Sequence, residues 1–400
     1  MKRYLLAVLA LVMVFHFSPV KAQEPLRDMV ARGLDRAASQ ALILARNMES
    51  LEGALPRTFE DGQLKTTNYA GWVSGFFPGV LWMLYDETGR TEFRDYAELF
   101  TQRVEPARKM TSTHDLGFML MSSFGHGYKL TGNKHYLDVI SEGTDSLLTR
   151  WNPRLGVMKS WESDRKWKYT VIIDNMMNLE MLCFLSKVSG DRRFEEIAQE
   201  HARTTLFNHF RPDGSSWHVV SYDPEKGCVQ VKETAQGISD DSAWARGQAW
   251  GLYGYTMMYR ETLNPAFLEQ ARIIGRFIKG HPNLPADKVP CWDFNAPGAP
   301  DTQRDASAGA IMASAFIELS QLDPGPESKE WLDIAIAQLR TLSSPGYLAE
   351  AGEQGGFLLK HSVGSLPGNS EVDVPLSYAD YYYIEALLRL KKLLGLQPGQ

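Results

Sequence analysis

Six short clusters of polar and aromatic residues recur along this chain of 400 residues, and each opens an apolar stretch with helical periodicity. Successive marker residues are 43, 59, 72, 58 and 76 residues apart, and each interval is long enough for a helical hairpin. Six hairpins predict a closed, all-α ring whose inner helices begin at one mouth and turn their N-terminal polar residues into a shared pocket. For any cluster taken alone, capping of its own helix is the simpler explanation. The markers are Trp72, Asp115, Asp174, Arg246, Arg304 and Asp380.

Helical periodicity dominates the rest of the chain, and strand signals are few. The clearest strand signal flanks the turn Asp223-Pro224-Glu225-Lys226-Gly227 and predicts one small inserted β-hairpin over residues 215–222 and 228–232. No linker rich in Pro, Gly or Ser interrupts residues 23–400, so we predict a single domain there. The predicted helices cover residues 26–48, 117–130, 176–188, 194–207, 249–263, 265–279, 308–322 and 381–394.

The first 22 residues have the pattern of a signal peptide: two cations, an apolar run, and a small-residue cleavage site at Val20-Lys21-Ala22. An uncleaved membrane anchor is the alternative, which the short apolar run disfavours. We therefore expect an exported, periplasmic protein that begins at Gln23, with no membrane span in the mature chain. Cleavage would leave 39 basic against 48 acidic residues, a balance that argues against nucleic-acid partners.

Cysteine and metal-site patterns are weak throughout the chain. Three widely spaced cysteines form neither a disulfide framework nor a zinc motif. The pair Asp240-Asp241 lacks EF-hand spacing, and no phosphate-binding loop or nucleophile elbow is present. We predict no cofactor and no metal, and the sequence assigns no oligomeric state.

Two acidic residues are the first candidates for catalysis. Asp174 lies between apolar residues, where desolvation favours the neutral, proton-donating form of a carboxyl, whereas Asp115 follows His114, a potential cationic partner. Two carboxyl groups whose pKa values are driven apart can divide acid and base roles. Both positions also open apolar helices, so a pair of N-caps is an equally weighted alternative.

Tryptophans in or beside the clusters favour a sugar-binding cleft, since indole faces stack on sugar rings. Arg246 lies between two of them, and its planar guanidinium suits a substrate carboxylate. His218 and Gln236 precede it as further binding candidates. The alternatives are an inter-helix ion pair for Arg246, a strand histidine with a satisfied surface partner for His218, and core packing for each tryptophan. The cluster tryptophans are Trp72, Trp161, Trp217, Trp244 and Trp250.

Taken together, these residues resemble the unsaturated glucuronyl hydrolases of glycoside hydrolase family 88, from about Tyr69 to Leu387. Each motif alone is a weak signal for this family, whereas the ordered set is specific to it. The resemblance implies an (α/α)6 barrel, in agreement with the six clusters. The matching motifs are Gly71-Trp72, His114-Asp115, Asp174-Asn175, His218, Gln236, residues 244–250 and residues 378–381.

The family removes the terminal 4,5-unsaturated uronate that polysaccharide lyases leave on oligosaccharides, by hydrating its C4=C5 vinyl ether. By resemblance, Asp174 protonates C4 and helps to activate the water, while Asp115 holds ring hydroxyls and tunes Asp174. His218, Gln236 and Arg246 match positions around the water and the uronate. Trp72, Trp244 and Trp250 match the aromatic walls of the cleft, and Trp161 is a further wall residue in a loop with weaker motif identity.

The implied substrate is a glycosaminoglycan fragment that ends in an unsaturated uronate. A related hydrolase of rhamnogalacturonan or ulvan fragments and a secreted sugar-binding protein without turnover are the alternatives. The polar segment 360–365 carries one cation and several hydroxyl groups. We expect it to be a loop whose Lys360 and Ser365 contact the second sugar and accept its sulfate, with a solvated loop as the equally weighted alternative.

Overall fold

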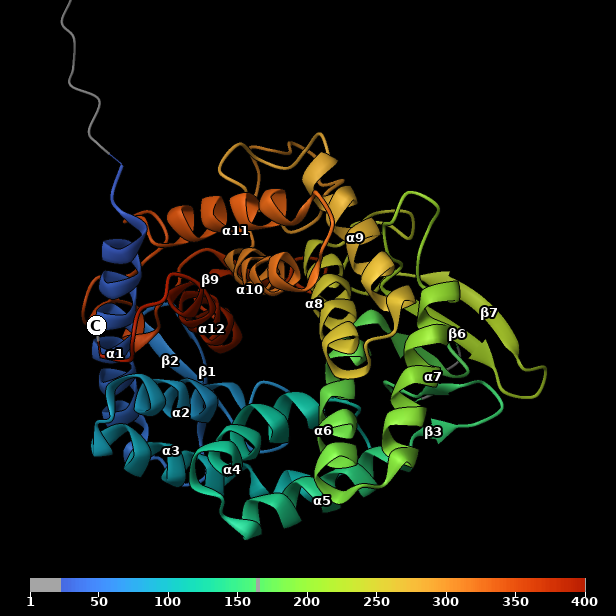
Figure 1. Ribbon diagram of the computed structural model, residues 1–400, viewed down its shortest axis with the longest axis horizontal. Coiled ribbons are helices and arrows are strands. Elements are labelled where there is room, and N and C mark those ends of the chain that lie inside the picture. Colours follow the sequence, from blue (N-terminus) through green and yellow to red (C-terminus); the bar gives the residue numbers. More distant parts are fainter. Residues whose placement is uncertain (1–22, 163–165, 400) are drawn as a thin grey trace, which may run out of the picture.

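Two concentric rings of helices build the molecule (Figure 1). The computed structural model describes residues 23–162 and 166–399. Inner and outer helices alternate along the chain, and α12 packs on α2 to close the inner ring. The inner ring contains α2 (Phe76–Thr88), π-helix η2 (Gly117–Gly125) with α4 (His126–Thr131), 3₁₀ helix η3 (Ile173–Asn178) with α6 (Leu179–Ser189), α8 (Ala245–Thr262), α10 (Ala306–Leu322) and α12 (Ser377–Leu393). The outer ring contains α1 (Leu26–Glu49), α3 (Thr91–Val104), α5 (Lys134–Leu148), α7 (Arg192–Asn208), α9 (Pro265–Gly280) and α11 (Ser328–Leu342). Two short 3₁₀ helices are η1 (Glu105–Lys109) and η4 (Glu353–Gly356).

The sequence of each helix explains its ring. In α10, 13 of 17 residues are buried, as expected for a helix that is apolar on all sides. In α9, 7 of 16 residues are buried, and they form a stripe that faces the inner ring. The predicted six helical hairpins are thus confirmed, and the fold is an (α/α)6 barrel.

Four small antiparallel sheets decorate the barrel, so the expectation of one inserted hairpin was incomplete. That hairpin is present as β6 (Val219–Asp223) and β7 (Cys228–Glu233), and β5 (Thr170–Ile172) extends it. The other strands are two to six residues long and have weaker strand signals in the sequence, since Pro56 and Gly364 interrupt two of them. They are β1 (Leu55–Glu60) with β2 (Gln63–Thr67), β3 (Trp151–Asn152) with β4 (Val157–Met158), and β8 (Ser362–Ser365) with β9 (Ser370–Val374).

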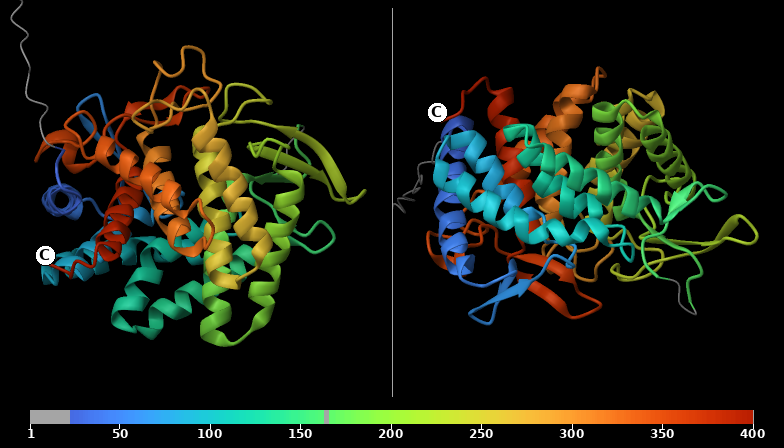
Figure 2. Two further views of the ribbon diagram at one scale, coloured as in Figure 1. Left: turned by 45° about the horizontal axis from the view of Figure 1, so that its top comes forward. Right: turned by 90° about the horizontal axis from the view of Figure 1, so that it is seen from below.

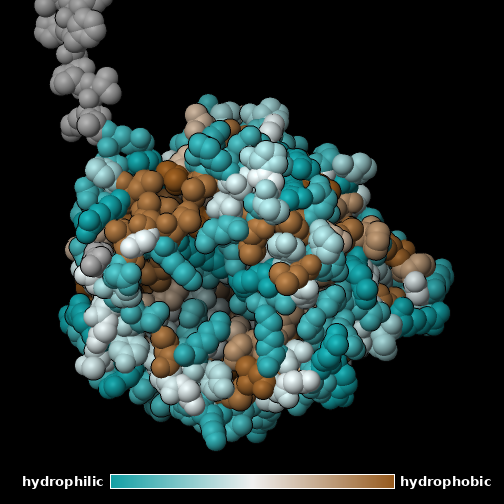
Figure 3. All heavy atoms as spheres, in the orientation of Figure 1, coloured by the Kyte–Doolittle hydropathy of each residue, from teal (hydrophilic) through white to brown (hydrophobic). Residues whose placement is uncertain are grey.

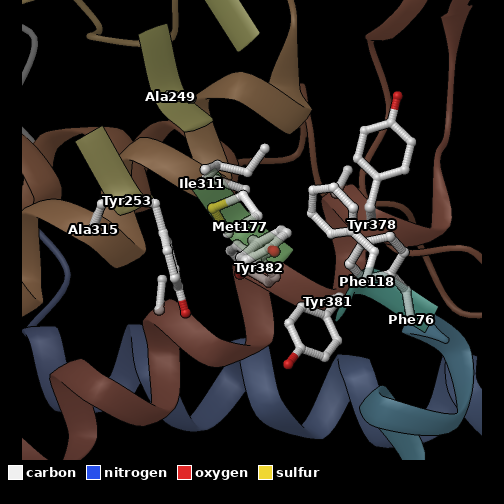
Figure 4. Close-up of a cluster of buried hydrophobic side chains, with 14 of the residues drawn as sticks. Phe76, Phe118, Met177, Ala249, Tyr253, Ile311, Ala315, Tyr378, Tyr381 and Tyr382 are labelled. Carbon is white, nitrogen blue, oxygen red and sulfur yellow. The ribbon is translucent and has the colours of Figure 1, made fainter. Parts of the chain in front are cut away.

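Hairpins β1–β2 and β8–β9 lie side by side at the end of the barrel where the inner helices begin (Figure 2, right panel, blue and red). At the middle of the barrel, aromatic side chains from α2, η2, α8 and α12 pack together (Figure 4). Phe118 is at the centre of this packing, with its ring centroid 5.7 Å from that of Phe76 and 5.0 Å from that of Trp250. This aromatic layer blocks the barrel axis.

A polar cavity lies beyond this layer, at the end of the barrel where the inner helices end. It forms a hollow at the centre of the face shown in Figure 3. Arg260 pairs there with Glu180 and Glu318, and Arg389 pairs with Glu318. The two guanidinium groups lower the pKa of both carboxyls against the effect of burial, and their positive charges compensate the negative ends of the inner helices.

No helix among the described residues is long and apolar enough to cross a membrane. The predicted signal peptide, residues 1–22, lies outside the described residues.

Candidate active site

A cavity of about 230 Å³ opens at the mouth where the inner helices begin. It shares no lining residue with the polar cavity at the other end, so it is blind at the aromatic layer. Five of the six sequence clusters contribute to its lining, which agrees with the expected shared pocket. The lining residues that come from these clusters are Trp72, His114, Asp115, Asp174, Arg246 and Tyr378.

Close packing of two inner helices brings the two acidic residues to this cavity. Asp115 lies just before η2, and Asp174 lies in the first turn of η3. Gly117 permits the approach, because a Cβ atom there would lie 2.5 Å from Cα of Asn178. The side-chain oxygen of Asn178 accepts a hydrogen bond of 3.1 Å from the backbone N–H of Phe118 and joins η2 to η3. Asp174 lies inside η3, and no capping hydrogen bond to the Asp115 carboxyl is present among the described residues, so the structure does not support the capping alternative.

Asp174 has the environment of a proton donor. Its side chain is 13% exposed, and its Oδ2 atom has no hydrogen-bond partner among the described residues. Burial raises the pKa of Asp174 from 3.8 to about 7. The positive charge of Arg246 opposes this shift, and the carboxyl of Asp115 adds to it. Near neutral pH, a substantial fraction of Asp174 therefore carries a proton.

Asp115 is held by its two neighbours on the N-terminal side. The Thr113 hydroxyl donates a hydrogen bond of 2.7 Å to Oδ2, and Nε2 of His114 lies 3.2 Å from Oδ1. Burial lowers the pKa of His114, so the expected cationic partner is a neutral imidazole. The His114 ring thus lies against Asp115 without adding a full positive charge.

His218 has a fixed tautomer. Its Nδ1 atom accepts hydrogen bonds from the backbone N–H groups of Ala235 and Gln236, so in the neutral ring the proton must be on Nε2. Burial lowers the pKa of His218 to about 3 and keeps the ring neutral. Nε2 lies 3.7 Å from Oδ2 of Asp174. His218 is therefore a donor that faces the acid, and it has no free lone pair with which to act as a base.

Arg246 lies in the cavity wall with most of its guanidinium bound to protein. Its Nη1 atom pairs with Asp305 at 3.0 Å and also donates to the Val363 carbonyl, while Nη2 donates to the Gly364 carbonyl. The ion pair between α8 and the start of α10 is the alternative that the sequence left open for this residue. Arg246 also lines the cavity, so it supplies positive charge there as well.

The four tryptophans that the resemblance implies as walls of the cleft separate into two groups. Trp72 and Trp161 line the cavity as expected. Trp244 and Trp250 do not, so their expected role as cavity walls was wrong: they are 4% and 0% exposed, and the packing of α8 places them behind the functional side chains. Trp244 packs against the His218 ring at 4.5 Å between ring centroids, and the Trp250 indole N–H lowers the pKa of Asp174.

Segment 360–365 consists of two residues without regular secondary structure followed by a strand. Residues Ser362–Ser365 form β8 and pair with β9, so the expected loop was wrong for this part. Ser365 lines the cavity, as does Gln236, whose amide donates to the Gly364 carbonyl. Lys360 is outside the cavity lining, since its ammonium group donates to the Pro345 carbonyl.

Sequence reasoning missed several residues at the cavity. Tyr378 belongs to the sixth cluster, so its position there was a usable signal. Arg57 and Glu371 lie on β1 and β9, strands whose sequence signals were too weak to be recognised. Among the described residues, no group of three or more His, Cys, Asp or Glu side chains could hold a metal ion.

Comparison with known proteins places this geometry in a family. The model of Glycosyl Hydrolase Family 88 matches residues 47–282. An unsaturated glucuronyl hydrolase of Formosa agariphila is 46% identical over 81% of this chain and 80% of its own length. An unsaturated chondroitin disaccharide hydrolase of Streptococcus pneumoniae is 33% identical, covering 92% of this chain and 93% of its own. The crystal structure of an unsaturated glucuronyl hydrolase specific for heparin matches 93% of this chain and 100% of its own, with a TM-score of 0.90 and 43% identity. By its sequence and its barrel alike, this chain belongs to Glycosyl Hydrolase Family 88.

Proposed function

We propose that this protein is an unsaturated glucuronyl hydrolase that removes the terminal 4,5-unsaturated uronate from lyase-generated glycosaminoglycan fragments. The observation that carries the proposal is the proton-holding carboxyl of Asp174 in a blind cavity. At about 230 Å³, the cavity is smaller than the roughly 300–1,000 Å³ of pockets for drug-sized ligands. Such a cavity suits one terminal sugar and leaves the rest of the chain outside. The names of the relatives support the same substrate class.

Hydration of the C4=C5 vinyl ether begins with protonation of C4, which generates oxocarbenium character at C5. Asp174 donates this proton, because its carboxyl is held partly neutral near pH 7. Asp115 holds the ring hydroxyls and stabilises the developing positive charge, since its carboxyl faces the same cavity. Arg246 and Gln236 lie beside the uronate, and Trp72 and Trp161 form the walls around its ring.

Water then adds at C5, and its proton returns to the Asp174 carboxylate. His218 cannot take this proton, because both backbone donors occupy its only lone pair. His218 instead uses Nε2–H to orient the carboxylate and the water. The resulting C5 hemiketal opens to a ketone at C5 and leaves a hemiacetal at C1. Breakdown of this hemiacetal to an aldehyde breaks the bond from C1 to the glycosidic oxygen and releases the remaining sugar as an alcohol, so one water is consumed and two products form. Asp174 ends the cycle protonated, as it began.

A panel of unsaturated disaccharides from different polysaccharide lyases tests the proposed function. We expect loss of the unsaturated-uronate absorbance with glycosaminoglycan products. Turnover of only rhamnogalacturonan or ulvan products would move the substrate class to the alternative hydrolases. Binding without any loss of absorbance would instead identify a sugar-binding protein and refute the proposed activity.

The pH dependence follows from the acid role of Asp174. Its protonated form is needed in the first step, and its pKa is raised to about 7, so kcat/KM should fall as the pH rises through about 7. Each further pH unit should lower kcat/KM by about tenfold. Initial rates at low substrate concentration between pH 5 and 9 measure this limb. A rate that is flat up to pH 9 would contradict the acid role.

We also propose that the protein is exported to the periplasm through cleavage after Ala22. The cationic start, the apolar run and the small-residue site support this location. The N-terminal sequence of the protein from fractionated cells tests it. A mature chain beginning at Gln23 in the periplasmic fraction is expected, and an intact Met1 in the cytoplasmic fraction would refute export.

A further inference from the structure

An ion pair spans the rim of the active-site cavity and joins the two hairpins that flank its mouth. On β1, the Arg57 guanidinium makes a two-pronged contact with Glu371 on β9, with Nε 2.7 Å from Oε1 and Nη2 3.0 Å from Oε2. Both residues line the cavity. The Arg57 side chain is 41% exposed and that of Glu371 is 13% exposed. The carboxylate thus lies beneath a guanidinium that remains accessible to a ligand.

Two backbone features hold Glu371 in this position. Its φ of 55° is in the left-handed region, which non-glycine residues rarely adopt. On the neighbouring strand, a Cβ atom at Gly364 would lie 2.7 Å from Cβ of Glu371, so a larger residue there would displace it. Elements far apart in the sequence therefore converge to fix this carboxylate at the rim.

The rim is where the second sugar of a substrate must lie. The terminal uronate has to reach Asp174, which is largely buried, and the aromatic layer closes the cavity behind it. The chain can then leave only through the mouth, past Arg57, Glu371 and the exposed Ser370. This step rests on the proposed function, because it assumes an unsaturated uronate at the chain end.

The charges of Arg57 and Glu371 determine which substituents on the second sugar are favoured at the rim. Glu371 occupies one edge of the Arg57 guanidinium, and among the described residues Nη1 has no partner. These N–H groups can donate to a hydroxyl or an acetamido oxygen. An anionic group would lose part of its hydration there and meet a guanidinium that Glu371 has already neutralised, so no net attraction offsets the cost of its desolvation.

We propose that the Arg57–Glu371 pair is the specificity determinant for the second sugar, and that it selects uncharged over sulfated residues at this position. Arg57 donates hydrogen bonds to the sugar, and Glu371 both aims Arg57 and cancels its charge. The same pair explains why Lys360, which is turned toward Pro345, is not needed as a sulfate receptor.

The test compares kcat/KM for two unsaturated disaccharides that differ only in one sulfate on the second sugar. In Glu371→Gln, Arg57 keeps a neutral partner and regains a net charge, so the ratio of sulfated to unsulfated efficiency should rise by at least ~5-fold. In Arg57→Gln, Glu371 is left unneutralised and the ratio should fall. Glu92→Gln is the matched control, because it removes one acid from an exposed ion pair with Arg46 on the outer ring. Its ratio should equal that of the wild type.

The outcomes separate this inference from the proposed function. A wild type that turns over neither disaccharide, nor any other lyase product, refutes the proposed function and this inference with it. A wild type that turns over either disaccharide, with the same ratio in Glu371→Gln as in Glu92→Gln, overturns this inference alone. A lower ratio in Glu371→Gln also overturns it, since that would make Glu371 the support of a sulfate receptor. Thermal melting verifies that each variant is folded, and Arg57→Gln decides the case if Glu371→Gln does not fold.

Discussion

Asp174→Asn should lose at least ~100-fold in kcat while the protein remains folded and still binds the unsaturated disaccharide. The amide has nearly the shape of the carboxyl, but it can neither donate a proton to C4 nor collect one from water. Kinetics by loss of the unsaturated-uronate absorbance measure kcat, and calorimetry on the inactive variant measures binding. Turnover within a few-fold of the wild type would remove Asp174 from the mechanism.

Asp380→Asn is the matched control for this experiment. Asp380 is also buried, and burial raises its pKa to about 7 as well, but it accepts hydrogen bonds from the backbone N–H groups of Leu358 and Leu359 and lies outside the cavity lining. Its amide variant should be less stable, because one amide N–H group would then face a backbone N–H donor. We expect its folded fraction to retain turnover within a few-fold of the wild type. A raised pKa alone therefore does not mark the catalytic acid.

The change in stability caused by Asp174→Asn should not follow the destabilisation expected for Asp380→Asn. The pKa of Asp174 is about 7 in the fold against 3.8 in the unfolded chain, so the folded state holds the proton more tightly. This contribution to stability is fully present below about pH 4 and is lost as the pH rises through about 7. The asparagine variant is free of this loss, so above pH 7 its melting temperature should equal or exceed that of the wild type.

Much of the barrel could be predicted because its signals are local. The span of α9 follows from an apolar stripe at helical spacing and Pro265 at its first position, and the structure has Pro265–Gly280 against the predicted 265–279. The predicted helix over 117–130 is instead a π-helix followed by α4, and its first residue, Gly117, packs against Asn178 from another hairpin. That contact joins residues about sixty positions apart, and no local pattern reveals it.

The residues of the active site also separate into those with a local signal in the sequence and those whose position depends on distant parts of the chain. Clustered polar residues at helix starts revealed Asp115, Asp174 and Arg246, because every inner helix begins at the same mouth. The roles of Trp244 and Trp250 were wrong because both indoles are packed in the core, one at the N-cap of α8 and one within the helix, and composition cannot tell a stacking platform from a packed indole. Glu371 was missed because its position depends on a left-handed backbone in a five-residue strand.

A buried ion pair between Asp305 and Arg246 joins α10 to the wall of the active-site cavity. Its removal is the second change for which we expect a large effect, here on the stability of the protein. Asp305 is fully buried at the N-cap of α10, where Oδ1 accepts a hydrogen bond from the backbone N–H of Ser307. Its Oδ2 atom pairs with Arg246, whose guanidinium also holds the carbonyls of Val363 and Gly364 in the cavity wall. The sequence pointed to Arg246 as a substrate ligand, but its anionic partner came from the next inner helix.

Asp305→Ala should destabilise the protein by about 3–5 kcal/mol, because it leaves the Arg246 guanidinium buried without its counter-charge and removes the cap. The melting temperature should fall by roughly 5–10 °C. Asp305→Asn keeps the cap and loses only the charge, so an intermediate shift in melting temperature would isolate the contribution of the ion pair.

Asp287→Ala is the control. It removes a carboxylate that pairs with Arg304, is 38% exposed and also accepts a hydrogen bond from a backbone N–H, so the loss of stability should stay at about 1 kcal/mol. Equal, small shifts in Asp305→Ala and Asp287→Ala would show that water or backbone groups compensate Arg246, and that its orientation in the cavity wall does not depend on α10.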